Sequence, residues 1–325
     1  MRDPVARPLI AAHYDPVVPR VILDCDPGYD DAIALLLAVG SPEVQLAGVT
    51  TVAGNQTVEK TTANAIRILD HVGRSDVPVA AGAQRPLVRE AVGAAEVHGD
   101  SGLDGADLPP PARDPEPAHA IDWIAGAVAA AATPITLVAT GPLTNVALLL
   151  ARHPEAGASL ERVVLMGGAI GEGNVTPAAE FNVWADPEAA HRVLTSGLAV
   201  TMVGLDVTHR ALIDDGHVRR LGGAGAAGRL AAGLYGFASR HHRERYGWAG
   251  IPVHDAVALA HVIDPTLLVT TRCGVVADTG TGLSRGRTHV DRWGQMGWPD
   301  NCEVAVGIDA ERFLELLVER ISALG

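Results

Sequence analysis

Short runs of apolar residues alternate along this chain with longer segments in which apolar positions recur at helical spacing. Strands are predicted at the short runs, over residues 20–26, 44–52, 134–140, 162–168 and 199–206. Each run starts apolar, as strands that are covered on both faces do, and ends in small or polar residues. Strands of this kind, alternating with helices, predict an α/β fold with an open, mainly parallel sheet flanked by helices.

Three segments depart from this alternation. The first, residues 82–117, ends in a Pro-rich stretch and predicts a loop over the sheet. The second, residues 216–253, is rich in Gly, His and Arg and predicts helices. The third begins with residues 273–294, which predict a small antiparallel hairpin near the C-terminus, and ends with an amphipathic helix over residues 309–321.

The composition is that of a globular protein. The chain has 325 residues, of which 48% are hydrophobic and 19% are charged, so it is long enough to bury a large core. It contains no internal repeat and no stretch typical of a domain linker. We therefore expect a poorly ordered N-terminal extension over residues 1–20 and a single domain over residues 21–325.

Charge and cysteine content restrict the partners and the compartment. A formal net charge of −13 without a basic cluster disfavours nucleic acid and anionic membranes as partners. The three cysteines are far apart, which disfavours a disulfide framework and suits a reducing compartment. No signal peptide is recognised, and the longest apolar passage, residues 124–132, is too short to span a bilayer. We expect a soluble, cytoplasmic protein.

Polar residues stand where the predicted strands end. They occur at residues 24–26, 53–57, 140–145, 167–182 and 206–209. In an open α/β sheet, ligands bind at the carboxyl ends of the strands. These segments are therefore expected to converge on one polar pocket.

Four aspartates fall within eight positions at the first strand end: Asp24, Asp26, Asp30 and Asp31. Asp30 or Asp31 can cap the following helix, which is favourable by about 0.3–1 kcal/mol. Helix capping does not explain Asp24 and Asp26, because they share one face at the end of a buried strand, where an unpaired carboxylate is costly. Several carboxylates beside oxygen-bearing loops suit a hard cation such as Ca²⁺ or Mg²⁺.

Two familiar metal motifs do not account for the cluster. An EF-hand loop that begins at Asp24 requires Gly and Glu where this chain has Tyr29 and Leu35. A phosphatase of the aspartyl-phosphate type usually carries a hydroxyl residue where this chain has Gly28.

The segment DCDPGYDDAIALL, residues 24–36, resembles the inosine-uridine-preferring nucleoside hydrolase family. Further segments resemble the family in the same order, at residues 49–65, 98–105, 139–147, 165–169, 173–190, 252–258 and 290–294. The resemblance implies the nucleoside hydrolase fold and Ca²⁺-dependent hydrolysis of the N-glycosidic bond of ribonucleosides to ribose and free base. It also implies a role in nucleoside catabolism and salvage, and a homodimer or homotetramer.

The resemblance assigns the metal and catalytic residues. Asp26, Asp31, the backbone carbonyl of Thr140 and Asp255 would hold the Ca²⁺. Asp26 would also be the general base that takes a proton from a calcium-bound water, and Asp24 would orient these ligands from behind. His254 would be the general acid at the leaving base, with His98 as the second candidate. For Asp255 alone, capping of the helix that follows it is the simpler explanation.

The same resemblance assigns the ribose site, which comprises Asp30, Asn55, Met166, Asn174, Glu180 and Asn182. Asn and Glu suit hydroxyl groups, which both donate and accept hydrogen bonds. Taken alone, Asn55 could equally be a turn residue after Gly54. The alternation of Glu180, Phe181 and Asn182 predicts both polar side chains on one side, with Phe181 opposite.

Base preference is left open by the sequence. It would depend on residues 216–253, where His241, His242, Tyr246 and Trp248 are candidates for contact with the base. Purine and pyrimidine substrates are both compatible with the presence of His98 and His254. Two other functions are possible for these residues, namely a non-catalytic nucleoside- or sugar-binding protein of the same fold and a metal-dependent phosphatase.

Overall fold

The computed structural model describes residues 18–248 and 250–325. The extension predicted over residues 1–20 therefore falls mostly outside the described residues, and β1 (Arg20–Cys25) begins at its last position. The division into this extension and one domain over residues 21–325 stays a prediction.

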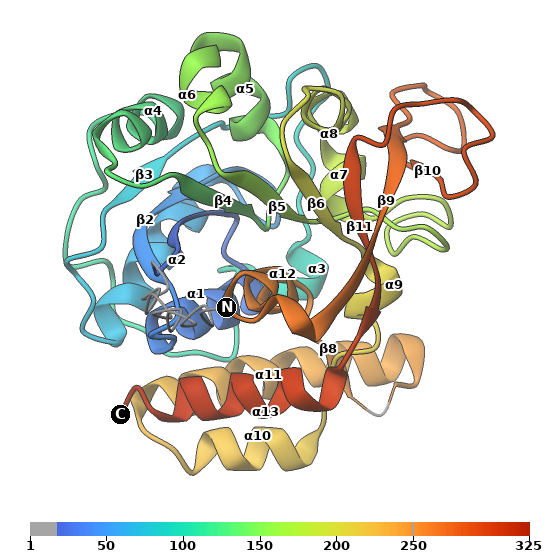
Figure 1. Cartoon of the computed structure of the whole chain (residues 1–325). Helices are drawn as coiled ribbons and strands as arrows, with labels where there is room; N and C mark the ends of the chain where they lie inside the picture. Colours follow the sequence, from blue (N-terminus) through green and yellow to red (C-terminus); the bar gives the residue numbers. More distant parts are fainter. Residues whose placement is uncertain (1–17, 249) are drawn as a thin grey trace, which may run out of the picture.

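The five predicted strands all form and lie side by side in one sheet (Figure 1). They are β1, β2 (Gln45–Thr51), β4 (Ile135–Ala139), β5 (Arg162–Met166) and β6 (Val200–Val203). All neighbouring pairs among them are parallel. The last strand is shorter than predicted, because Leu205–Thr208 form the short helix α9.

In the described part of the chain, the sheet has nine strands in the order β10-β9-β11-β6-β5-β4-β1-β2-β3. The strand β3 (Val79–Ala81) extends one edge and was not predicted, because three residues carry no periodicity. At the other edge, the predicted hairpin is confirmed as β9 (Leu268–Ala277) and β10 (Thr288–Asp291). Strand β11 (Cys302–Ile308) pairs antiparallel with β9 and parallel with β6, so it joins the hairpin to the main sheet. A separate antiparallel pair consists of β7 (Leu212–Ile213) and β8 (Ile251–Pro252).

Helices cover both faces of the sheet, which explains the consecutive apolar residues of its strands (Figure 1). Along β1, Val21 and Leu23 belong to one core and Ile22 to the other. The helices packed against the first core are α1 (Tyr29–Gly40), α2 (Val58–His71), α11 (Ala226–Tyr246), α12 (His254–Ile263) and α13 (Ala310–Ser322). Those packed against the second are α4 (Ala120–Ala130), α5 (Thr144–Arg152) and α8 (Pro187–Leu194).

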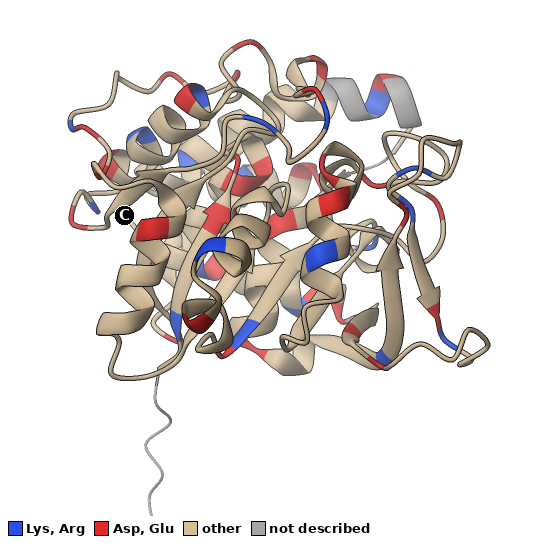
Figure 2. Ribbon diagram, turned by 90° about the horizontal axis from the view of Figure 1, so that it is seen from above, with Lys and Arg blue, Asp and Glu red and all other residues tan. Residues whose placement is uncertain are grey.

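The remaining helices are short or lie outside these layers. They are α3 (Ala95–His98), α6 (Pro154–Ala158), α7 (Phe181–Ala185), α10 (Asp215–Gly222) and the 3₁₀ turn η1 (Pro265–Leu267). With α11, α10 confirms the helices predicted over residues 216–253, and α13 confirms the predicted C-terminal helix. No helix in the described part of the chain is long and apolar enough to span a membrane. Among the described residues, Lys and Arg are spread over many separate parts of the ribbon (Figure 2).

The C-terminal ends of the parallel strands all lie on the same side of the sheet, the carboxyl edge. Asp26 follows β1, Thr140 follows β4 and Gly167 follows β5 at this edge. Helix α12 begins here with His254 and Asp255. The topology therefore brings segments that are far apart in sequence to one place.

Candidate active site

A cavity of about 540 Å³ opens at the carboxyl edge of the sheet. Ten of the residues predicted to form the site line it: Asp30, Asn55, His98, Thr140, Met166, Asn174, Glu180, Asn182, His254 and Asp255. Asp26 and Asp31 are completely buried below this lining and are hydrogen-bonded to Asn55, which belongs to it. The structure thus brings together residues that are far apart in the sequence, such as Asp26 and Asp255, which are 229 positions apart and whose carboxylates repel each other.

Asp31 ties the end of β1 to the start of α1. Its Oδ1 accepts hydrogen bonds from the backbone N–H of Asp26 (3.2 Å) and from the Thr140 hydroxyl (2.9 Å). Its Oδ2 accepts from the Gly28 N–H and from Asn55 Nδ2, both at 3.2 Å. A carboxylate at a helix N-terminus is stabilised by the N–H groups exposed there. The capping that the sequence suggests is therefore real for Asp31, and it fixes the carboxylate at the cluster.

Asp26 is held more loosely. Its Oδ2 accepts the backbone N–H of Asn55 at 2.6 Å, while its Oδ1 is buried without a hydrogen-bond partner in the described structure. Two glycines allow the loops to approach this closely. A Cβ added to Gly54 would lie 2.1 Å from Asp26 Oδ2, and one added to Gly141 would lie 2.7 Å from Oδ1.

Asp26, Asp30, Asp31 and Asp255 form a buried group of like charges. Burial is the largest cause that raises the pKa of each, and repulsion from neighbouring carboxylates adds to it for Asp26, Asp30 and Asp255. The pKa of Asp30 rises to about 8. Within the described residues, no ion pair brings a Lys, Arg or His to any of the four.

This group fits a bound cation. Carboxylate oxygens of Asp30, Asp31 and Asp255 lie within 4.8 Å of one another. Oδ1 of Asp26 and Oδ1 of Asp30 are both buried without a hydrogen-bond partner in the described chain, and such an atom is costly unless something binds it. Oxygen donors with several negative charges are the ligands that hard divalent cations prefer.

Thr140 contributes its hydroxyl and its carbonyl to the same region. The hydroxyl donates to Asp31, and the carbonyl accepts a hydrogen bond from Asn182 Nδ2 at 2.7 Å. Because a carbonyl oxygen has two lone pairs, this bond leaves one lone pair for a further partner.

Asp24 lies behind the cluster and does not line the cavity. Its Oδ1 accepts hydrogen bonds from the Thr50 hydroxyl (2.6 Å) and from Asn145 Nδ2 (2.8 Å). Burial raises its pKa to about 6, and these two hydrogen bonds oppose the rise. Asp24 thereby joins β1 to β2 and α5, a placement that suits the orienting role expected of it.

The loop after β5 holds Glu180 and its neighbours. Both oxygens of Glu180 accept backbone hydrogen bonds, Oε1 from Asn182 (2.8 Å) and Oε2 from Gly168 (2.9 Å), so Glu180 caps α7. Burial raises its pKa to about 7. Asn174 Oδ1 accepts the N–H of Phe181 at 3.0 Å. These polar side chains are therefore fixed in the cavity wall by the chain itself.

The alternation predicted over residues 180–182 is wrong. These residues begin helix α7 instead of continuing a strand, so successive side chains do not point to opposite sides. As a result, Phe181 lines the cavity together with Glu180 and Asn182. A three-residue pattern is too short to distinguish the two periods.

The predicted histidines His98 and His254 line the cavity from different elements. Nδ1 of His98 accepts the backbone N–H of Tyr29 at 3.3 Å, and the two rings are stacked at 4.9 Å. A neutral His98 therefore carries its hydrogen on Nε2. His254 Nδ1 lies 2.8 Å from the hydroxyl of Thr208. Each ring is thus held through Nδ1.

The structure adds aromatic residues that sequence reasoning did not assign to the site. His209 packs edge-on against Trp248 (5.0 Å) and His254 (5.6 Å), and all three line the cavity with Tyr29 and Trp184. His209 ends one of the polar segments that follow the predicted strands, and this position was the signal for it. Trp248, a candidate for base contact, is at the cavity. The side chains of the other three candidates, His241, His242 and Tyr246, lie outside the described residues.

Comparison with known proteins identifies the family to which the chain is similar. The family model described as inosine-uridine preferring nucleoside hydrolase matches residues 21–315. The pyrimidine-specific ribonucleoside hydrolase RihA of Shewanella sp. strain ANA-3 is 49% identical over 304 residues, covering 93% of this chain and 96% of that protein. The protein of the same name from Salmonella arizonae is 46% identical over 307 residues, covering 94% and 99%.

Solved structures agree with the described fold. The plant nucleoside hydrolase PpNRh1 superposes with a TM-score of 0.88 at 32% identity, covering 94% of this chain and 99% of that chain. The purine-preferring ribonucleoside hydrolase from Gardnerella vaginalis gives 0.88 at 34% identity, covering 94% and 98%. The fold class and the family resemblance predicted from the sequence are confirmed.

Proposed function

The chain belongs to the inosine-uridine preferring nucleoside hydrolase family, and we propose that it hydrolyses the N-glycosidic bond of pyrimidine ribonucleosides with the help of Ca²⁺. The pyrimidine preference is supported by the relatives at 46–49% identity, which carry the name pyrimidine-specific ribonucleoside hydrolase. The purine-preferring enzyme among the solved structures is more distant, at 34% identity. A cytoplasmic location and a homodimeric or homotetrameric state stay predictions.

One observation carries the chemistry. Four buried carboxylates repel one another at the floor of a cavity whose walls present amide and carboxylate groups. A bound cation would offset the repulsion between these carboxylates, and the hydroxyl groups of a sugar would form hydrogen bonds with the amide and carboxylate groups of the walls. A ribose beside a divalent cation meets both requirements.

Asp26, Asp31, Asp255 and the carbonyl of Thr140 would hold the Ca²⁺. When bound, Ca²⁺ supplies positive charge that compensates the carboxylates and makes a nearby water more acidic. The buried, unpartnered oxygens of Asp26 and Asp30 and the free lone pair of the Thr140 carbonyl support this set.

Asp26 is the proposed general base. Its Oδ1 has no other partner in the described structure and would accept the proton of the water that attacks the anomeric carbon. Positive charge that develops on the ribosyl group in an oxocarbenium-like transition state would be stabilised by the carboxylates around it. The residues that would bind the ribose are Asp30, Asn55, Met166, Asn174, Glu180 and Asn182.

His254 is the proposed general acid. It would donate a proton to the departing base, which is a poor leaving group as an anion, and His98 is the second candidate for this role. Both rings line the cavity and are oriented through Nδ1, by Thr208 and by the Tyr29 N–H respectively.

The test is a panel of ribonucleosides assayed for reducing sugar and free base after removal of metal and after addition of Ca²⁺. We expect uridine and cytidine to be hydrolysed faster than inosine, metal removal to abolish release, and Asp26→Ala to abolish release in a folded protein. Tight binding of nucleosides without turnover would favour a binding protein. Release of inorganic phosphate from nucleotides without base release would favour a phosphatase.

A further inference from the structure

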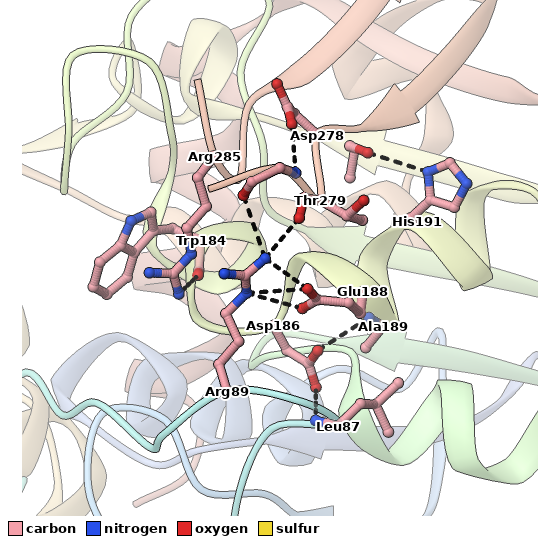
Figure 3. Close-up of polar contacts among 12 residues, drawn as sticks. Leu87, Arg89, Trp184, Asp186, Glu188, Ala189, His191, Asp278, Thr279 and Arg285 are labelled. Atoms are coloured by element: carbon pink, nitrogen blue, oxygen red, sulfur yellow. Dashed lines mark hydrogen bonds and ion pairs between the residues drawn. The ribbon is translucent and has the colours of Figure 1, made fainter. Parts of the chain in front are cut away.

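Arg89 joins three segments of the chain beside the cavity (Figure 3). Its Nε lies 3.0 and 3.2 Å from the two carboxylate oxygens of Glu188 in α8, and its Nη2 lies 2.7 Å from one of them. The same Nη2 donates to the carbonyl oxygens of Thr279 (2.6 Å) and Gly280 (3.3 Å) in the β9–β10 loop. The Arg89 and Glu188 side chains are only 19% and 20% exposed, so this forked ion pair is largely shielded from water.

A second contact fixes the same segment two residues earlier. The backbone N–H of Leu87 donates to Asp186 Oδ2 at 2.9 Å. Asp186 is completely buried, caps α8 through the Ala189 N–H and accepts the Thr144 hydroxyl at 2.7 Å. Residues 87–89 are therefore attached to the start of α8 by both backbone and side chain.

The β9–β10 loop also holds Trp184, which lines the cavity. Arg285 donates to the Trp184 carbonyl oxygen at 2.9 Å, and its guanidinium lies 4.4 Å from the centre of the indole ring. Gly286 adopts a φ of +76°, and a Cβ there would lie 2.6 Å from Trp184 Cα. Burial and the positive charge of Arg89 lower the pKa of Arg285, while Glu188 opposes that effect. The negative charge of Glu188 thus compensates the positive charges of Arg89 and Arg285.

The segment that carries Arg89 reaches the cavity a few residues later. Residues 92–94 line the cavity, and the N–H of Ala94 donates to the carbonyl oxygen of Asn55 at 3.0 Å. Two parts of the cavity wall, residues 92–94 and Trp184, are consequently attached to the same loop through the two arginines.

We propose that Arg89 is a positioning residue of the active site, which holds residues 92–94 and Trp184 in the cavity wall through Glu188 and the β9–β10 loop. The described hydrogen bonds of Arg89 go to Glu188, Thr279 and Gly280, outside the proposed catalytic residues. Its loss should therefore disturb substrate binding more than the chemical step. This kinetic consequence rests on the proposed function.

Substitution of Arg89 tests the proposal. Arg89→Met should raise KM for the best ribonucleoside about tenfold, because displaced wall residues bind the substrate poorly, and leave kcat within about twofold. Arg89→Lys keeps the positive charge but cannot form the forked hydrogen bonds of a guanidinium, so its KM should lie between those of wild type and Arg89→Met. Adding Glu188→Gln to Arg89→Met should raise KM little further, because the two residues act as a pair.

A matched control is Arg320→Met. Arg320 in α13 forms a similar ion pair with Glu43, at 20% and 35% exposure. Glu43 directly precedes β2, so this pair lies at the amino ends of the parallel strands, opposite the cavity. The control should lose comparable stability without a change in KM. An equal rise of KM in both variants, or a fall of kcat with KM unchanged in Arg89→Met, would overturn the proposal.

Hydrogen exchange provides a readout that does not need activity. Peptides from residues 86–94 and 181–186 should exchange faster in Arg89→Met than in wild type, and should be unchanged in Arg320→Met. Unchanged exchange in Arg89→Met would refute the positioning role. Failure of the wild-type protein to release base from any ribonucleoside would instead reject the proposed function, while exchange would still decide whether Arg89 holds the wall.

Discussion

Asn55 holds Asp26 through two hydrogen bonds, one from its backbone and one from its side chain. The backbone N–H donates to Asp26 Oδ2 at 2.6 Å, and Nδ2 donates to the Asp26 carbonyl at 3.2 Å. The same Nδ2 also lies 3.2 Å from Asp31 Oδ2. The Asn55 side chain therefore connects the end of β1 to the start of α1, in addition to facing the cavity where a ribose contact is predicted.

Asn55→Ala should weaken Ca²⁺ binding at least about tenfold, because groups that orient metal ligands typically contribute 10- to 100-fold to affinity. Calorimetric titration of the metal-free protein with Ca²⁺ measures the change. Asn301→Ala is the control, since the Asn301 amide also donates two partly buried hydrogen bonds, to the Leu194 and Val275 carbonyls, and Asn301 does not line the cavity. Equal Ca²⁺ affinity in wild type and Asn55→Ala would contradict the role given to this side chain.

Gly54→Ala should disable the site more severely. The added methyl group would lie 2.1 Å from Asp26 Oδ2 and 2.7 Å from Pro142, so the Asp26 carboxylate or the loop must shift. We expect base release to fall at least about a hundredfold, since small displacements of reacting groups have effects of this size. Steady-state assays with uridine measure it.

Gly126→Ala is the matched control for that substitution. Gly126 lies inside α4, and a Cβ there has nothing within 4 Å. Ala in a helix interior is favoured over Gly by about 0.5–1 kcal/mol, so this variant should be slightly more stable and fully active. Activity of Gly54→Ala equal to that of Gly126→Ala would show that the close approach to Asp26 is dispensable.

The sheet could be predicted from the sequence because its strands are buried on both faces and therefore consecutively apolar. Val21, Ile22 and Leu23 show this directly, since neighbours in the chain belong to different cores. By contrast, β3 is a three-residue strand whose place is set by pairing with β2, and pairing has no signature in so short a run.

The aspartate cluster was visible in the sequence because its like charges needed an explanation, and the family resemblance supplied the distant residues. The aromatic part of the cavity was harder to predict. His209 had only its place at the end of a polar segment as a signal, and Trp184 had none; His209 follows α9 and Trp184 lies in α7, at the cavity. Phe181 was placed on the wrong side because a helix begins where a strand was assumed.

Glu180 should make stability depend on pH in a way that Glu180→Gln removes. Its pKa is raised from 4.5 to about 7 by burial, so the folded protein binds more protons than the unfolded chain between these values. The stability that the protonated form contributes is therefore present below about pH 4.5 and lost as pH rises through about 7. The shift corresponds to about 3 kcal/mol.

Urea unfolding at several pH values with saturating Ca²⁺ checks this. Relative to wild type, Glu180→Gln should gain about 3 kcal/mol in free energy of unfolding between about pH 4.5 and about pH 8. Glu59→Gln, at an exposed position of α2, is the control for loss of a carboxylate. A difference between Glu180→Gln and wild type that does not change with pH would show that Glu180 ionises normally in the folded protein.

His254→Ala should reduce kcat in a way that depends on the leaving group. A general acid matters when the departing base must be protonated, and its loss costs about 10²- to 10⁴-fold in rate. Uridine and cytidine should show this loss. An activated riboside whose leaving group departs as a stable anion needs no proton and should be hydrolysed at a rate close to that of the wild-type enzyme, because the aspartate cluster and the attacking water are unaffected.

His98→Ala, measured with the same pair of substrates, distinguishes the two histidines, since only the proton donor should show the difference between leaving groups. An equal loss on both substrates in His254→Ala would mean that the ring orients the substrate or shapes the cavity through Thr208 and His209, and the role of general acid would pass to His98 if that variant alone discriminates.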